Sequence, residues 1–151
     1  KLIFFAKDVT VETNGSISLL HYGLCYLPRV RTNGYGSVRF VVDYKLPSSG
    51  MERNMVFKEN APLLQEQDVV KFVISDMVDL GRAYTVLNIP CKAKMVFSPA
   101  VKMTPQGPDL RWATQLAEKL IEASPKLPRP VQFSLQLHKI LWPGSGEKNE
   151  R

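Results

Sequence analysis

The feature that most constrains the fold is the stretch Val38–Leu46, in which large apolar residues alternate with other residues. This period of two is typical of a β-strand with one buried face. Turn-forming residues flank it, Asn33-Gly34-Tyr35-Gly36 before and Pro47-Ser48-Ser49-Gly50 after. We therefore expect a core strand. Aspartate is rare inside strands, so we also expect the Asp43 carboxylate to hold this strand in place through a hydrogen bond or an ion pair.

Similar alternation predicts further strands along the chain. The Asn14-Gly15 pair is a strong signal for a hairpin between the first two of them. Asp79-Leu80-Gly81 is interpreted as a turn, and Pro90 separates two strands or bends one. The expected strands are Leu2–Val11, Ser16–Leu27, a short edge strand at Met55–Phe57, Val69–Asp76, Tyr84–Ile89, Cys91–Phe97 and Val131–Leu141.

One segment follows helical spacing instead. Apolar residues recur on one face between Leu110 and Ile121, Asp109 can cap the amino end, and Ser124-Pro125 ends the helix. The predicted fold is mainly β (α+β), an antiparallel β-sandwich or jelly roll of about eight strands with this one helix near the C-terminus. A parallel doubly wound sheet is excluded by the lack of predicted helices between the early strands. Residues 1–143 are predicted to form a single β-rich domain, followed by a polar tail at 144–151.

The charge distribution favours an anionic partner. The chain contains 20 Lys and Arg residues and 14 Asp and Glu residues, which gives a formal net charge of +6. Three long stretches contain basic residues but no acidic ones. Such segregation is typical of a nucleic-acid-binding face, although solvated charges that keep a domain soluble give the same pattern. Tyrosines among the cations could stack on unpaired bases. The candidate nucleic-acid-binding residues are Arg29, Arg31, Arg39, Lys92, Lys94, Lys102 and Tyr35.

No catalytic, metal or cofactor site is predicted. His21 and Cys25 lie on one predicted strand, about 13 Å apart at 3.3 Å per residue, too far for a nucleophile and its base. Only two cysteines occur, Cys25 and Cys91, which indicates a reducing, intracellular compartment. Because the chain opens on Lys1 without a secretory pattern, we expect an excised domain.

The order of these features resembles the thirty-kilodalton superfamily of plant-virus cell-to-cell movement proteins. The resemblance is carried by Leu20-His21-Tyr22-Gly23, by Gly34 and by Val41-Val42-Asp43-Tyr44-Lys45, where the family usually has Leu-x-Asp-x-Arg. It implies a jelly-roll-like protein that binds single-stranded RNA or DNA without sequence preference and associates with membranes at plasmodesmata in the host cytoplasm. Asp43 would match the family's hallmark aspartate.

A second resemblance gives an alternative from another class. Lys1-Leu2-Ile3-Phe4-Phe5-Ala6-Lys7 is similar to the aromatic and basic first strand of some matrix proteins of negative-strand RNA viruses. That likeness implies a structural protein that self-associates and bridges nucleocapsid and an acidic membrane surface. Both resemblances imply a protein without enzymatic activity.

Overall fold

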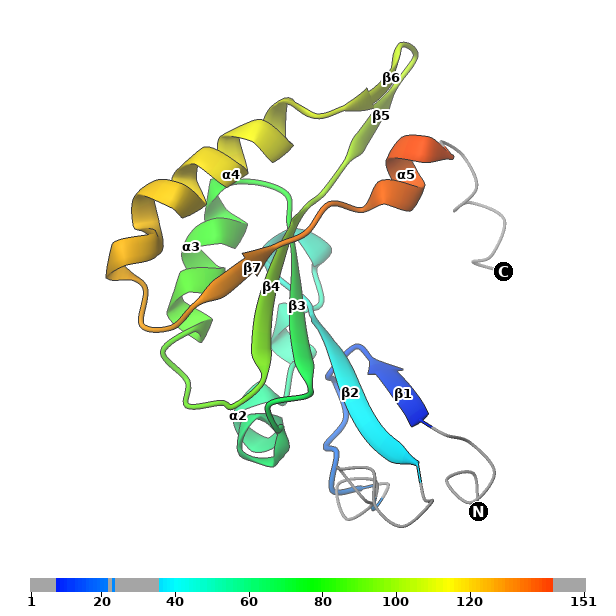
Figure 1. Cartoon of the computed structure of the whole chain (residues 1–151), viewed down its shortest axis with the longest axis vertical. Coiled ribbons are helices and arrows are strands. Elements are labelled where there is room, and N and C mark those ends of the chain that lie inside the picture. The colour runs from blue at the N-terminus through cyan, green and yellow to red at the C-terminus, as the bar shows by residue number, and fades with distance from the viewer. Residues whose placement is uncertain (1–7, 22, 24–35, 143–151) are drawn as a thin grey trace.

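The computed structural model describes residues 8–21, 23 and 36–142, and their main feature is a wholly parallel five-stranded sheet (Figure 1). The strand order is β1-β2-β3-β4-β7. The strands are β1 (Asp8–Thr13), β2 (Ser37–Tyr44), β3 (Val69–Ile74), β4 (Lys94–Pro99) and β7 (Val131–Phe133). Since all five run in one direction, the segments that follow them meet at the same edge of the sheet, the carboxyl edge.

Helices and a small hairpin occupy the connections. The helices are α2 (Phe57–Asn60), α3 (Met77–Val86), α4 (Arg111–Ala123) and α5 (Leu137–Leu141). Short 3-10 turns are η2 (Pro47–Ser49), η3 (Glu52–Asn54), η4 (Ala61–Leu63) and η5 (Ser124–Lys126). An antiparallel hairpin, β5 (Lys102–Thr104) with β6 (Gly107–Asp109), projects from the end of β4 (Figure 1).

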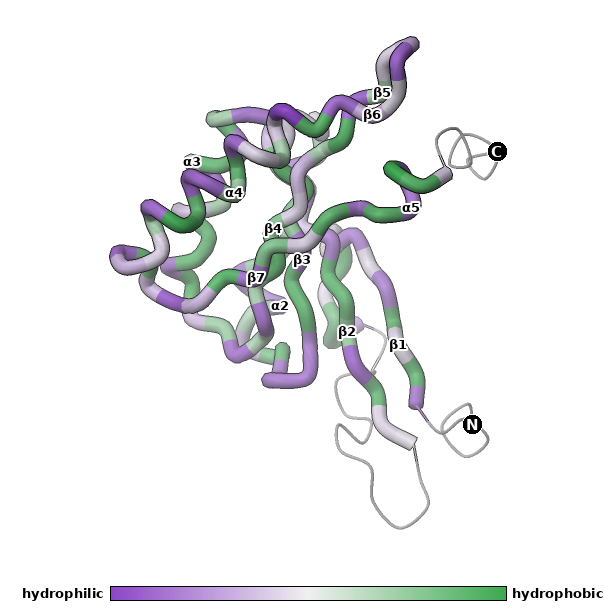
Figure 2. Tube along the Cα trace, turned by 45° about the horizontal axis from the view of Figure 1, so that its top comes forward, coloured by the Kyte–Doolittle hydropathy of each residue, from purple (hydrophilic) through white to green (hydrophobic). Residues whose placement is uncertain are grey.

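One face of the sheet packs against the helices and forms a single core. Every second residue of β2 and β3 is buried, as is Phe97 of β4. These side chains meet Leu80 of α3 and Leu116 of α4. In Figure 2 the apolar colour runs along β3, whereas α4 alternates between apolar and polar residues, as expected for a helix on the surface of a core.

The opposite face, here called the open face, alternates with the core residues and stays half-buried or exposed for most of its length. It includes Thr10, Arg39, Val41, Asp43, Val69, Lys71, Val73, Lys94, Val96, Ser98 and Gln132. Parallel sheets are usually covered on both faces. The polar residues of the open face are therefore available to a ligand or to further polypeptide.

The predicted antiparallel sandwich or jelly roll is wrong. The predicted Asn14-Gly15 hairpin is also wrong, because β1 and β2 are neighbours in parallel register, with Val9 opposite Val38. Gly15 does adopt a positive φ of 70°, but it does so in a longer crossover between parallel strands. Period-two alternation marks a half-buried strand without giving its direction, and the helices of the described part of the chain cover only one face of this sheet.

Helices explain most of the other differences. The predicted turn at Asp79–Gly81 lies within α3, and the predicted strand at Tyr84–Ile89 is the end of α3 and the turn after it. The predicted edge strand at Met55–Phe57 leads into α2. The long final strand stops at Phe133 and the chain turns into α5. The core strand at Val38–Leu46, the strand at Val69–Asp76 and the late helix correspond to β2, β3 and α4.

Parts of several predictions fall outside the described residues. These include most of the predicted strand Ser16–Leu27 and the tail at 144–151, so the single domain over 1–143 stays a prediction. Among the described helices, none combines the length and the apolar character that a membrane crossing requires.

Candidate functional site

The carboxyl edge of the sheet is the candidate functional site. In open parallel sheets, ligands bind outside the carboxyl ends of the strands, where the connecting loops converge. Five segments follow the five strands at this edge: residues 14–16, 45–50, 75–76, 100 and 134–136. They carry five serines together with Asn14, Asp76 and Gln136, which suit hydrogen bonding to a ligand.

The loop after β1 is held by tight packing and by side-chain hydrogen bonds. A Cβ at Gly15 would lie 2.7 Å from Cε of Met55 and 2.9 Å from Cγ1 of Val42, and φ is positive, so only glycine fits. The Asn14 carboxamide oxygen accepts hydrogen bonds from the amide (3.1 Å) and the hydroxyl (2.8 Å) of Ser16. The loop therefore presents Asn14 and Ser16 in a fixed arrangement.

A buried carboxylate joins the loops that follow β2 and β3. Asp79, on the first turn of α3, is fully buried and accepts hydrogen bonds from the Ser48 amide (3.0 Å), the Ser48 hydroxyl and the Ser75 amide (2.9 Å). Asp76 caps the same helix by accepting from the amides of Val78 and Asp79, both at 2.9 Å. Asp79 thus fixes two loops of the carboxyl edge relative to each other.

Two buried polar atoms near the ends of β4 and β7 have no hydrogen-bond partner among the described residues. They are Oγ of Ser98, a residue that is fully buried, and Oε1 of Gln136. The Ser134 amide donates to the Phe97 carbonyl (2.9 Å), so the segment after β7 continues beside the end of β4. Buried polar atoms without partners are rare in folded proteins, and a polar ligand at this place would satisfy them.

Charged groups line the open face next to this edge. Asp43 lies directly opposite Lys71 on the neighbouring strand and accepts a hydrogen bond from Nζ of Lys45 (2.7 Å). Lys71 is half-buried and forms no ion pair with a described residue. Its ammonium group is therefore available to an anionic ligand.

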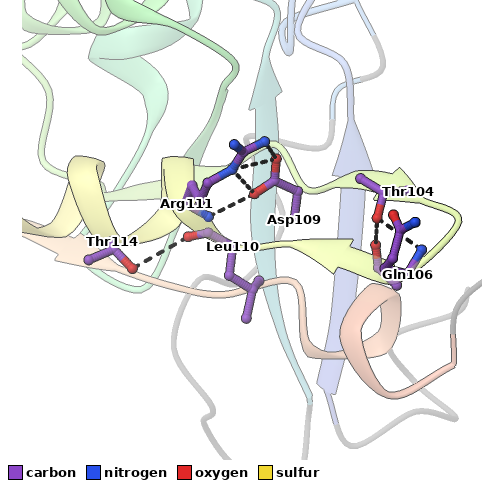
Figure 3. Close-up of polar contacts among 7 residues, drawn as sticks. Thr104, Gln106, Asp109, Leu110, Arg111 and Thr114 are labelled. Carbon is purple, nitrogen blue, oxygen red and sulfur yellow. Dashed lines mark hydrogen bonds and ion pairs between the residues drawn. The ribbon is translucent and has the colours of Figure 1, made fainter.

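A side pocket of about 370 Å³ extends beyond the ends of β3 and β4. The indole nitrogen of Trp112 donates to the Ile74 carbonyl (2.7 Å) in its wall. At its rim the guanidinium of Arg111 lies against the carboxylate of Asp109 and lowers the pKa of that carboxyl to about 2 (Figure 3). Because Asp109 and Arg111 neutralise each other, this pair contributes no net charge to the site.

The described candidate nucleic-acid-binding residues lie at three places in the fold, and only Lys92 and Lys94 lie in one pocket. Arg39 donates from Nε to Oγ1 of Thr10 (2.8 Å) on the open face, whereas Lys92 and Lys94 lie where β4 begins and Lys102 lies in the hairpin after β4 ends. Arg29, Arg31 and Tyr35, like Cys25, lie outside the described residues. For Asp43 the ion pair with Lys45 is observed, and its importance for stability stays a prediction.

The residues that organise the carboxyl edge were not identified from the sequence. The sequence pattern predicts a strand end at Asp76 and a turn at Asp79, although an aspartate with an acidic residue three positions later is also typical of a helix start. Ser98 and Gln136 carry no motif. Their importance depends on burial, which sequence spacing does not give.

Comparison with known proteins gives two related sequences, both named 7-carboxy-7-deazaguanine synthase. The chain is 31% identical to the enzyme of Clostridium acetobutylicum over 137 residues, which cover 89% of this chain and 53% of that protein. It is 32% identical to the enzyme of Leptospira interrogans over 125 residues, which cover 76% of this chain and 48% of that protein. The chain thus spans about half the length of the curated relatives that it matches. No protein-family model and no solved structure matches it.

These relatives overturn the functional predictions. The resemblance to viral movement proteins and the matrix-like alternative are both wrong, because the matching proteins are bacterial enzymes. The expectation of a non-enzymatic protein and that of nucleic acid or membrane as main partner are contradicted by the same relatives. Over most of its length, the chain is similar to 7-carboxy-7-deazaguanine synthase.

Proposed function

We propose that this chain provides part of the active site of a 7-carboxy-7-deazaguanine synthase and binds the deazaguanine ring at the carboxyl edge of its sheet. The observation that carries the proposal is the 31% identity over 137 residues, which extends across 89% of the chain. The unpartnered polar atoms at the ends of β4 and β7 support this location for the ligand.

The compound that gives the relatives their name has two chemically different parts. Its ring carries the hydrogen-bonding edge of guanine, and position 7 carries a carboxylate. A site that takes both parts needs polar atoms for the ring and a cation for the carboxylate. Sites built to hydrogen-bond a ligand reject analogues that leave buried groups unpaired, so the same groups would provide specificity.

For the ring, we propose Ser98 and Gln136. Each has a buried oxygen that finds no described partner, and both belong to neighbouring segments at the carboxyl edge. A hydroxyl can donate and accept, while a carboxamide oxygen accepts from ring N–H and amino groups. Together these two side chains can pair with the mixed donor and acceptor edge of a guanine-like ring.

For the carboxylate, we propose Lys71. Its neighbour Asp43 is already engaged by Lys45, which leaves Lys71 without an ion pair among the described residues. A half-buried ammonium gains more from an anion than an exposed one does, because it is less screened by water.

Calorimetric titration with two ligands tests the role of Lys71. Replacing it by methionine, K71M, should weaken binding of 7-carboxy-7-deazaguanine about 10- to 100-fold, the range for losing a hydrogen bond to a charged group. Binding of 7-deazaguanine, which lacks the carboxylate, should change little. Lys58→Met, an exposed lysine on α2, is the matched control. Equal losses for both ligands would contradict the assignment.

The same titration tests the ring contacts. Ser98→Ala and Gln136→Ala should each weaken both ligands by about 2- to 10-fold, because each removes one neutral hydrogen bond. Thr114→Ala, at an exposed position on α4, should bind like the parent chain. If the parent chain binds neither ligand, the proposed function itself fails.

The compartment is also a proposal. Cys91 carries a free, half-buried thiol. Free thiols persist in reducing compartments, which supports an intracellular enzyme.

A further inference from the structure

A second pocket lies at the opposite end of the sheet, where β4 and β7 begin. It has a volume of about 390 Å³. We call it the amino-edge pocket, and it is lined mainly by Cys91, Lys92, Lys94, Pro128, Arg129 and Gln132. Three of its lining residues are cationic and none is acidic.

Arg129 is fixed in the wall of this pocket. Its Nη1 donates to the Cys91 carbonyl (2.6 Å) and its Nη2 donates to the Ile89 carbonyl (3.1 Å). Carbonyl oxygens are neutral, so these bonds orient the guanidinium without cancelling its charge. Its Nε is buried and donates to no described acceptor. A partly desolvated cation of this kind is costly unless an anion lies near it.

Lys92 and Lys94 add two more positive charges at exposed positions. The described residues place no carboxylate within ion-pairing distance of either lysine or of Arg129. The amino-edge pocket therefore concentrates three cations whose charges are not balanced locally. Like charges in one pocket repel one another, and this repulsion is relieved when an anion binds.

Two further titratable groups lie near these cations. Asp68 lies near Cys91, but it is fully buried and accepts hydrogen bonds from the Phe40 and Gln65 amides, both at 2.7 Å. Burial raises the pKa of the Cys91 thiol, so this group stays neutral at physiological pH. The thiol therefore adds no negative charge, and Asp68 neither lines the pocket nor forms an ion pair with one of its three described cations.

We infer that the amino-edge pocket binds the phosphate group of a small phosphomonoester. Phosphate is a compact dianion, and lysine ammonium groups together with a fixed arginine are the usual partners of such an ion. Pro128 and Pro130 give the pocket an apolar wall that can pack against the organic part of the molecule. The volume is within the range of small-molecule sites. This binding would occur at the opposite end of the sheet from the proposed deazaguanine site.

Calorimetric titration of the chain with inorganic phosphate and with phenyl phosphate tests the inference. Both should bind, phenyl phosphate more tightly because its ring can contact the two prolines. The double variant Lys92→Gln, Lys94→Gln should lose at least about tenfold in affinity for both probes, since two charge-assisted contacts disappear. Lys119→Gln, on α4, is the control and should bind both probes like the parent chain.

Amide chemical shifts in NMR spectra locate the site independently of affinity. Phosphate should shift the amides of residues 91–94 and 129–132, and the shifts should saturate. The inference is overturned if the parent chain shows no saturable binding, if the double variant binds as tightly as the parent, or if the shifts cluster elsewhere. Arg129 is left unchanged in this test, because its loss would free two backbone carbonyls and disturb the fold.

Discussion

Asp79 is the residue on which the geometry of the carboxyl edge most depends. Its buried carboxylate accepts three hydrogen bonds from Ser48 and Ser75. Asp79→Ala would leave these donors unpaired, and we predict a loss of about 3 kcal/mol or more in the free energy of unfolding, measured by urea denaturation. The control variant Glu118→Ala, at an exposed position on α4, should change the free energy of unfolding by less than about 0.5 kcal/mol. Similar values for the two variants would show that Asp79 does not hold the loops.

Two tyrosines offer a matched test of buried hydroxyl groups. The hydroxyl of Tyr84 is buried without a described partner, whereas that of Tyr44 lies close to the guanidinium of Arg82, with which it interacts favourably. Tyr84→Phe should therefore leave the unfolding free energy at pH 7 unchanged or slightly higher, and Tyr44→Phe should lower it by about 1 kcal/mol. Circular dichroism during urea denaturation measures both, and a clear loss in Tyr84→Phe would contradict the prediction.

The same tyrosines predict a loss of stability at alkaline pH. Burial raises the pKa of both hydroxyls above the ordinary value of 10.0, so the folded state keeps its protons where the unfolded chain releases them. The unfolding free energy then falls as the pH rises through about 10, and the stabilisation is fully present below that value. Tyr84→Phe should reduce this fall between pH 9 and pH 11, within the same series of denaturation curves.

At the scale of elements, the sequence predicts the positions of strands and helices well where apolar residues recur without interruption on one face of the element. The period of two in β2 and β3 and the helical period in α4 depend only on local burial, and these elements are found where they were expected. Strand direction depends on the path of the connections. Leu80, Ala83 and Leu87 do follow helical spacing in and after α3. The turn signals Asp79 and Gly81 interrupt this pattern in the sequence, so it predicts a turn and a strand and misses the parallel crossover.

The helix α4 allows a direct test of how an element is anchored. Leu116 is fully buried against β4, whereas Ile121 on the same helix is 75% exposed. Leu116→Ala should lower the unfolding free energy by about 2 to 5 kcal/mol, and Ile121→Ala should change it by less than about 0.5 kcal/mol. Thermal or urea denaturation compares the two, and equal effects would show that the apolar face of α4 does not anchor it.

At the scale of the whole molecule, the candidate site was not predictable because it is a property of topology. Four residues of this site are far apart in the sequence: Asn14, Ser75 and Gln136 come after three different strands, and Ser98 lies near the end of a fourth. They converge at one edge only because all five strands are parallel. An antiparallel sheet would divide the same residues between two edges, so the wrong topology also hid the site.

The parallel sheet gives the molecule two chemically distinct ends. The carboxyl edge carries the unpartnered oxygens of Ser98 and Gln136, and the amino edge carries Lys92 and Arg129. Ser98 lies four residues after the start of β4 at Lys94, roughly 13 Å along the strand, and Lys92 lies further back. Perturbations at sites this far apart, with no shared partner, usually act independently.

We therefore predict that the two proposed sites respond separately to mutation. Lys92→Gln should weaken phosphate binding and leave the affinity for 7-carboxy-7-deazaguanine unchanged within about twofold, whereas Gln136→Ala should do the reverse. Calorimetric titration of both variants with both ligands gives the four affinities. If Lys92→Gln weakens deazaguanine binding as much as phosphate binding, the cations of the amino edge act on the carboxyl edge and the two ends form one electrostatic unit.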